Sequence, residues 1–279
     1  MSIWYRFCEL LPFEMLQWDF MKNAVLAIFL ITPLLGLTST MIVTGRMSFF
    51  SDALGHSAFT GIAIGAIFSV AAPTWVAVIF SILFAVIFSY VRSRSNQAAD
   101  TLIGVFSSAA VALGIFVATL DGGSFAKYNK YLIGDILSVT PGEIGQLSIV
   151  LLCVLIYWII ASNRLILCAL HPQLASSRGI RVDLTQTIFT VAVAVIVTLS
   201  ISWVGLLILN SLLVLPAAAS RNIARNMRQY HLFSVLIALV AGIAGLVLAY
   251  CFGASAGAAI SLVLAVIFLI SFLLRKVRS

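Results

Sequence analysis

The sequence predicts an all-helical protein that crosses a lipid bilayer many times. Of its 279 residues, 62% are hydrophobic and only 9% are charged, whereas soluble domains carry about 25% charged residues. A soluble fold with this composition would expose apolar patches far larger than the few hundred Å² that monomers tolerate. The apolar residues also form long unbroken runs, not the alternating segments of about 10 residues found in membrane barrels. Because backbone groups in lipid must be satisfied internally, these runs indicate helices.

The apolar runs are long enough for eight or nine membrane spans. A span needs about 20 apolar residues, with about 17 as the lower limit. Nine candidate spans begin near Ala24, Ser48, Thr74, Thr101, Ile144, Leu184, Trp203, Leu232 and Ser255. Residues 185–219 are barely long enough for two crossings and are also compatible with a short hairpin or a re-entrant element. Residues 122–143 are ambiguous and are compatible with a short helix at the membrane surface.

The chain has no long linker or low-complexity tract, so we predict one membrane domain over residues 1–279. Residues 1–22 are rich in Trp, Tyr and Phe and suit a helix at the membrane interface. Residues 162–183 form the longest predicted cytoplasmic connector, which is too short for a soluble catalytic domain. The four cysteines are scattered without a CxxC pair, so we expect neither a disulfide nor a cysteine metal site.

Basic residues in the connectors predict the orientation of the chain. They lie mostly on alternate connectors, at Arg92, Arg94, Arg164, Arg178, Arg181, Arg221, Arg225, Arg228, Arg275, Lys276 and Arg278. The connectors around Ala72 and Gly253 have no basic residue. By the positive-inside rule the C-terminus is cytoplasmic. Counting back through nine crossings places Arg46 inside as well and the N-terminus outside. The net charge of +7 therefore reflects orientation in the membrane and not binding of nucleic acid.

One predicted span carries two ionisable residues, Asp52 and His56, although such groups are rare in lipid and cost roughly 2.5–3.5 kcal/mol each. Their i, i+4 spacing places them on one helix face. Extended by four residues in each direction, this row contains Ser48, Asp52, His56 and Thr60. The neighbouring row reads Ala53, Ser57, Gly61, Gly65 and is small enough for close helix packing. The span therefore combines a polar face with a small-residue face.

The polar face indicates a translocation pathway for a metal ion. If Arg46 marks the inner interface, Asp52 lies about 9 Å and His56 about 15 Å into the bilayer core. Carboxylate and imidazole are ordinary ligands for zinc, manganese and iron. We therefore assign Asp52 and His56 as metal ligands, and Ser48 and Thr60 as pathway-lining residues. Two ligands per chain make a weak site, which suits a carrier, and two copies of the chain could gather two Asp and two His. Two alternatives remain open: a pair that only satisfies itself between helices, and a proton relay through His56.

The sequence contains no motif of a known enzyme class. It lacks the HExxH motif of zinc proteases, the GxSxG nucleophile elbow and the Walker A motif. An intramembrane aspartyl protease would need two carboxylates at one depth, but Asp135 is predicted at the outer interface and Asp52 lies toward the inner side. We therefore assign no catalytic residue and no permanently bound cofactor, and we expect ATP, if it drives the protein, to bind another chain.

Five segments, in order, resemble the membrane-spanning subunits of ABC importers for zinc, manganese and iron, and most closely the zinc-uptake branch. They are GRMSFFSDALGHSAFTGIAIG, QAADTLIGVFSSAAVALG, YLIGDILSVTPGE, HPQLASSRGI and WVGLLILNSLLVLPAAASR. The resemblance runs along nearly the whole chain.

The resemblance implies partners and roles that composition does not show. It implies two permease copies, two cytoplasmic ATP-binding subunits and an extracytoplasmic metal-binding protein in the plasma (inner) membrane of a prokaryote. It matches Asp52 and His56 to the pair that lines the metal path. It matches residues 171–180 to a short coupling helix that docks on the ATPase, with Leu174, Ala175 and Gly179 at its recurring positions.

Two departures from the family pattern bear on the choice of metal. Many zinc-branch members carry a histidine near Ser107 and Ser108, and an acidic residue with proline near the segment GASAG at 253–257, where this chain has neither. Zinc remains the first expectation, with manganese and iron as alternatives. The rival function is a stand-alone secondary metal or proton-coupled transporter, which would have no need of a coupling helix.

Overall fold

The computed structural model describes residues 2–9, 14–68, 73–120 and 135–278. These residues form eleven α-helices and two 3₁₀-helices, and none of them lies in a strand. Eight of the helices are long and apolar enough to cross a membrane. The prediction of an all-helical polytopic membrane protein is therefore confirmed.

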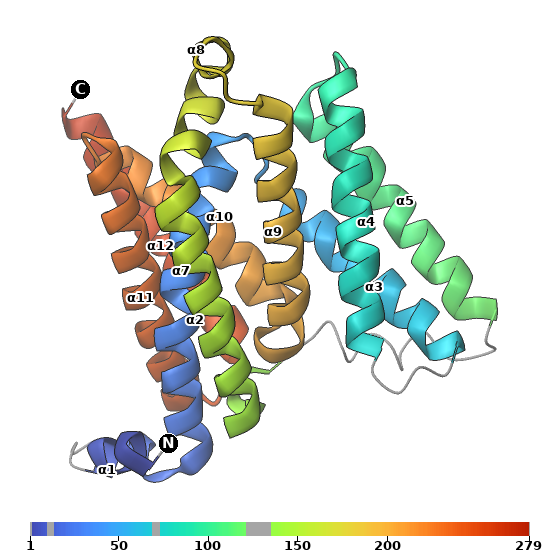
Figure 1. The fold of residues 1–279 in the computed structure, drawn as a ribbon. Coiled ribbons are helices and arrows are strands. Elements are labelled where there is room, and N and C mark those ends of the chain that lie inside the picture. Colours follow the sequence, from blue (N-terminus) through green and yellow to red (C-terminus); the bar gives the residue numbers. More distant parts are fainter. Residues whose placement is uncertain (1, 10–13, 69–72, 121–134, 279) are drawn as a thin grey trace. The chain divides into compact units, whose positions relative to one another are not determined.

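Most of the described chain lies in the eight candidate spans. They are α2 (Asp19–Thr44), α4 (Pro73–Arg94), α5 (Ala99–Leu120), α7 (Pro141–Leu170), α9 (Val182–Val204), α10 (Leu206–Ile223), α11 (Met227–Phe252) and α12 (Ala256–Arg278) (Figure 1). The other elements are α1 (Ser2–Glu9), η1 (Glu14–Gln17), α3 (Phe50–Ile67), η2 (Ile136–Ser138) and α8 (Pro172–Ser177).

Two regions account for the range of eight or nine spans. The stretch 185–219 belongs to two membrane-length helices, α9 and α10, which are separated at Gly205 with φ +87°. Only glycine adopts this backbone conformation readily. α3 has 18 residues, so it is about 27 Å long, and it is not among the eight because it carries Asp52 and His56. Of the ambiguous stretch 122–143, residues up to 134 lie outside the described part.

By its internal contacts the chain forms two compact units. The first comprises Met1–Thr40, Asp135–Ile156 and Trp203–Ser279, and the second comprises Met41–Gly134 and Tyr157–Ser202. In the first unit α10, α11 and α12 pack against one another, and in the second α3 packs against α4 and α5. Nothing in these contacts tests the single membrane domain predicted over residues 1–279, which stays a prediction.

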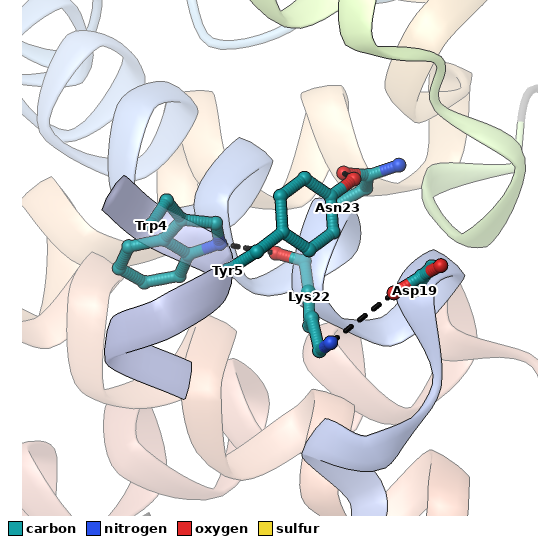
Figure 2. Close-up of polar contacts among 5 residues, drawn as sticks. All are labelled: Trp4, Tyr5, Asp19, Lys22 and Asn23. Carbon is teal, nitrogen blue, oxygen red and sulfur yellow. Dashed lines mark hydrogen bonds and ion pairs between the residues drawn. The ribbon is translucent and has the colours of Figure 1, made fainter. Parts of the chain in front are cut away.

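In the first unit, α1 is tied to the start of α2 by polar side chains (Figure 2). The indole Nε1 of Trp4 donates to the carbonyl oxygen of Lys22 at 2.9 Å, and the Tyr5 hydroxyl donates to Oδ1 of Asn23 at 2.7 Å. The Lys22 ammonium lies 5.1 Å from the centre of the Tyr5 ring and 3.2 Å from Oδ1 of Asp19. The expected N-terminal helix is therefore present and docked, and its position at the membrane interface stays a prediction.

Candidate functional site

Asp52 and His56 lie together on α3, in the second unit. Oδ2 of Asp52 is 3.5 Å from Nε2 of His56, which is the i, i+4 contact that the spacing predicts. Both side chains are partly exposed, at 45% for Asp52 and 31% for His56. Asp52 is in the first turn of α3, where a negative charge is stabilised by the helix dipole. The two predicted ligands thus share one face and are accessible.

The other two residues of the polar row are placed differently. Ser48 lies in the turn that precedes α3. Thr60 is buried, and its hydroxyl donates to the carbonyl oxygens of Ala110 at 2.8 Å and His56 at 3.0 Å. The Thr60 hydroxyl therefore holds α3 against α5. A role for Ser48 or Thr60 in lining the pathway stays a prediction.

The small-residue row of α3 packs closely on α4, as predicted. A Cβ added at Gly61 would overlap the Cα of Ala77. One turn earlier, the hydroxyls of Ser57 and Ser81 are 3.1 Å apart and share a hydrogen bond. On the α5 side, a Cβ at Gly114 would lie 2.6 Å from Oγ1 of Thr60. α3 is thus held between α4 and α5, while Asp52 and His56 remain partly exposed.

The chemistry of the pair suits a divalent transition metal that binds weakly. It offers one carboxylate and one imidazole, which are ligands for zinc and manganese. No group of three or more His, Cys, Asp or Glu side chains that could hold a metal occurs in the described part of the chain. The role of Asp52 and His56 as metal ligands stays a prediction.

The turn that leads into α3 depends on a residue that the sequence identified only as an orientation marker. The guanidinium of Arg92, at the end of α4, donates to Sδ of Met47 at 2.8 Å and to the carbonyl oxygen of Gly45 at 3.1 Å. Arg46, between them, has φ +55°, a left-handed conformation that is uncommon outside glycine. Arg92 therefore holds the backbone from which the site helix starts. A single arginine in a basic connector gives no sequence signal of this role.

The predicted coupling segment forms a short helix, α8, with a defined end. The Gly179 amide donates to the carbonyl oxygen of Ser176 at 3.0 Å, and the Ile180 amide to that of Ala175 at 3.1 Å. Gly179 has φ +75°, so these bonds form a Schellman cap, which favours glycine at this position. Ala175 is fully buried, whereas Leu174 is 44% exposed. Leu174 is therefore available to a partner, and the coupling role of all three residues stays a prediction.

Three of the segments assigned to the cytoplasmic side meet at one end of the second unit. A single cavity there is lined by the turn at Gly45 to Met47, by Arg92, and by Cys168, Ala169 and Pro172 at the start of the coupling connector. This arrangement agrees with the count of crossings, which placed Arg46, Arg92 and the connector on the same side.

Comparison with known proteins extends over almost the entire chain. Residues 17–275 match the ABC 3 transport family. The high-affinity zinc uptake system membrane protein ZnuB of Haemophilus influenzae is 29% identical over 95% of this chain and 99% of its own. The manganese import system permease protein ScaB of Streptococcus gordonii is 28% identical over 92% and 91%. The structure of PsaBC from Streptococcus pneumoniae in complex with Fab superposes with a TM-score of 0.79 at 25% identity, covering 98% of this chain and 95% of the other.

Proposed function

Because this chain belongs to the ABC 3 transport family, we propose that it is the permease subunit of an ATP-driven importer for a divalent transition metal. Zinc is the first expectation, with manganese and iron as alternatives. Similarity to a zinc uptake protein at 29% and to a manganese import permease at 28% supports this metal class and does not separate its members.

The observation that carries the proposal is the Asp52–His56 pair. A carboxylate and an imidazole 3.5 Å apart, both partly exposed on a helix that carries no other ionisable residue, provide ligands of the kind that mark a transport path when they lie within a membrane. With only two protein ligands, the ion is held loosely enough to be released. The metal would pass this face while the protein alternates between outward-open and inward-open states.

The proposed transporter needs other chains. The sequence has no Walker A motif, so two copies of a separate cytoplasmic ATP-binding subunit would supply hydrolysis and dock on α8. A second copy of this permease would complete the pathway, and an extracytoplasmic protein would deliver the metal. The complex would lie in the inner membrane of a prokaryote, with the C-terminus of this chain in the cytoplasm.

The test is metal uptake by cells that depend on this importer. Asp52→Ala and His56→Ala should each reduce uptake at least about tenfold, because each removes one of two protein ligands and second-sphere changes alone cost 10–100-fold in metal affinity. Asp100→Ala is the matched control, since Asp100 is exposed at the start of α5 and lies outside the polar row of α3. Its uptake should equal that of the unmodified protein.

Normal uptake by both site variants, at normal protein levels, would contradict the proposed pathway. Uptake that persists without ATP, together with purification free of any ATPase, would contradict the importer and favour a secondary carrier. Competition between zinc, manganese and iron in the same assay identifies the metal.

A further inference from the structure

The cavity at the end of the second unit is positively charged and has no acidic lining residue among those the structure describes. Its volume is about 270 Å³, and its polar lining includes Arg46, Arg92 and Gln186. Small-molecule pockets usually have about 300–1,000 Å³, so this cavity suits a small headgroup. Met41, Leu165 and Phe189 line it as well and give it an apolar side.

Arg92 has donors to spare for a ligand. A guanidinium carries five N–H donors, and the two hydrogen bonds to the Met47 sulfur and the Gly45 carbonyl oxygen are both to uncharged acceptors. Arg46 is exposed on the same cavity. Two arginines without a neighbouring carboxylate in the lining offer a fork geometry that matches phosphate oxygens.

We propose that this cavity binds the phosphate group of an anionic phospholipid, with Arg46 and Arg92 as its ligands. Basic pockets between membrane helices are suited to phospholipid headgroups. Four of the helices that contribute lining residues, α2, α4, α7 and α9, are candidate membrane spans, and the apolar side of the cavity fits an amphiphile better than a free phosphate ion. Because the site abuts the turn that starts α3, a bound lipid would brace the site helix. The inference does not depend on which metal is carried.

The experiment measures the melting temperature of the full-length purified protein in a non-ionic detergent. Dioctanoyl phosphatidylglycerol should raise the melting temperature in a saturable manner, and dioctanoyl phosphatidylcholine should raise it much less. Arg46→Asn should weaken the apparent affinity for phosphatidylglycerol about fivefold, since one basic residue near a membrane surface contributes about that factor. Asn tolerates the left-handed conformation of position 46, so this variant keeps the turn. Arg92→Gln is only a second variant, because it also removes the hydrogen bonds from Arg92 to Met47 and Gly45 that hold the turn.

The matched control is Arg228→Asn, because Arg228 is exposed and does not line this cavity. It should respond to phosphatidylglycerol like the unmodified protein. Equal responses to both lipids, or an unchanged affinity in Arg46→Asn, would overturn the proposal. An equal stabilisation by inorganic phosphate alone at the same concentration would overturn the assignment to a lipid.

Discussion

At Gly61 the backbones of α3 and α4 approach so closely that no other side chain fits. A Cβ at this position would overlap the Cα of Ala77, and it would also lie 3.1 Å from Cβ of Phe80. Because the obstacle is backbone, it cannot be relieved by a rotamer change. We predict that Gly61→Ala destabilises the protein by about 1–3 kcal/mol, the usual cost of overpacking, measured as a lower melting temperature in detergent.

Gly104 in α5 provides the matched control for this prediction. It is also a helical glycine of the second unit, but a Cβ there would meet nothing within 4 Å. Gly104→Ala should leave the melting temperature unchanged or raise it, because alanine is the better helix former. If the two variants melted alike, close packing at Gly61 would not be what holds α3 on α4.

The residues of the site differ in how far sequence could identify them. The proximity of Asp52 and His56 could be predicted, because the helical period places residues four apart on one face, while their role as metal ligands stays a prediction. The packing role of Gly61 followed from the same period. Arg92 could not be predicted, because its partners are the sulfur of Met47 and a carbonyl oxygen 47 residues away, and no local pattern indicates such a contact.

Among the elements, α1 is joined to α2 by side-chain contacts that can be removed without losing a ring. Trp4 and Tyr5 each donate a hydrogen bond to α2, and the Trp4 ring also packs edge-on against Phe29 with centroids 6.2 Å apart. The double variant Trp4→Phe, Tyr5→Phe keeps the aromatic rings and removes both donors. Each bond contributes about 0.5–1.5 kcal/mol, so α1 should open about tenfold more often.

Trypsin cleavage at Arg6, which is exposed on α1, measures this opening. The rate should rise about tenfold in the double variant. Trp18→Phe is the control, since Trp18 is 57% exposed and lies outside the two bonds, and it should be cleaved at the unmodified rate. Equal rates for all three proteins would mean that α1 is held by other contacts.

Helix existence was predictable from apolar length, whereas helix boundaries depended on local backbone geometry. The stretch 185–219 could not be divided from composition alone, because a single residue, Gly205, separates α9 from α10. In contrast, Asp52 and His56 lower the mean hydropathy of α3, so that it is not among the eight candidate spans. The same two residues made α3 the candidate site helix. Two other polar residues of α3 are accommodated by its neighbours, because Ser57 shares a hydrogen bond with Ser81 of α4 and Thr60 donates to the Ala110 carbonyl oxygen of α5.

At the scale of the whole molecule, the proposed function requires partner subunits, and Leu174 is the residue best placed to test that requirement. It is 44% exposed on α8, next to the fully buried Ala175, so it can be changed without disturbing the packing of the helix. We predict that Leu174→Glu lowers the amount of copurifying ATPase at least about tenfold, equivalent to roughly 1.4 kcal/mol of binding free energy. The melting temperature of the permease alone should not change.

Leu184→Glu is the control for this prediction, because Leu184 is 51% exposed in the first turn of α9 and lies outside residues 171–180. It should retain the ATPase, which separates a docking contact from a general effect of an added negative charge. A third variant, Gly179→Val, should also lose the ATPase, but together with stability, because a branched side chain is strained at φ +75° and the Schellman cap that ends α8 would be broken. If Leu174→Glu bound the ATPase normally, α8 would not be the coupling helix, and the rival function as a secondary carrier would gain support.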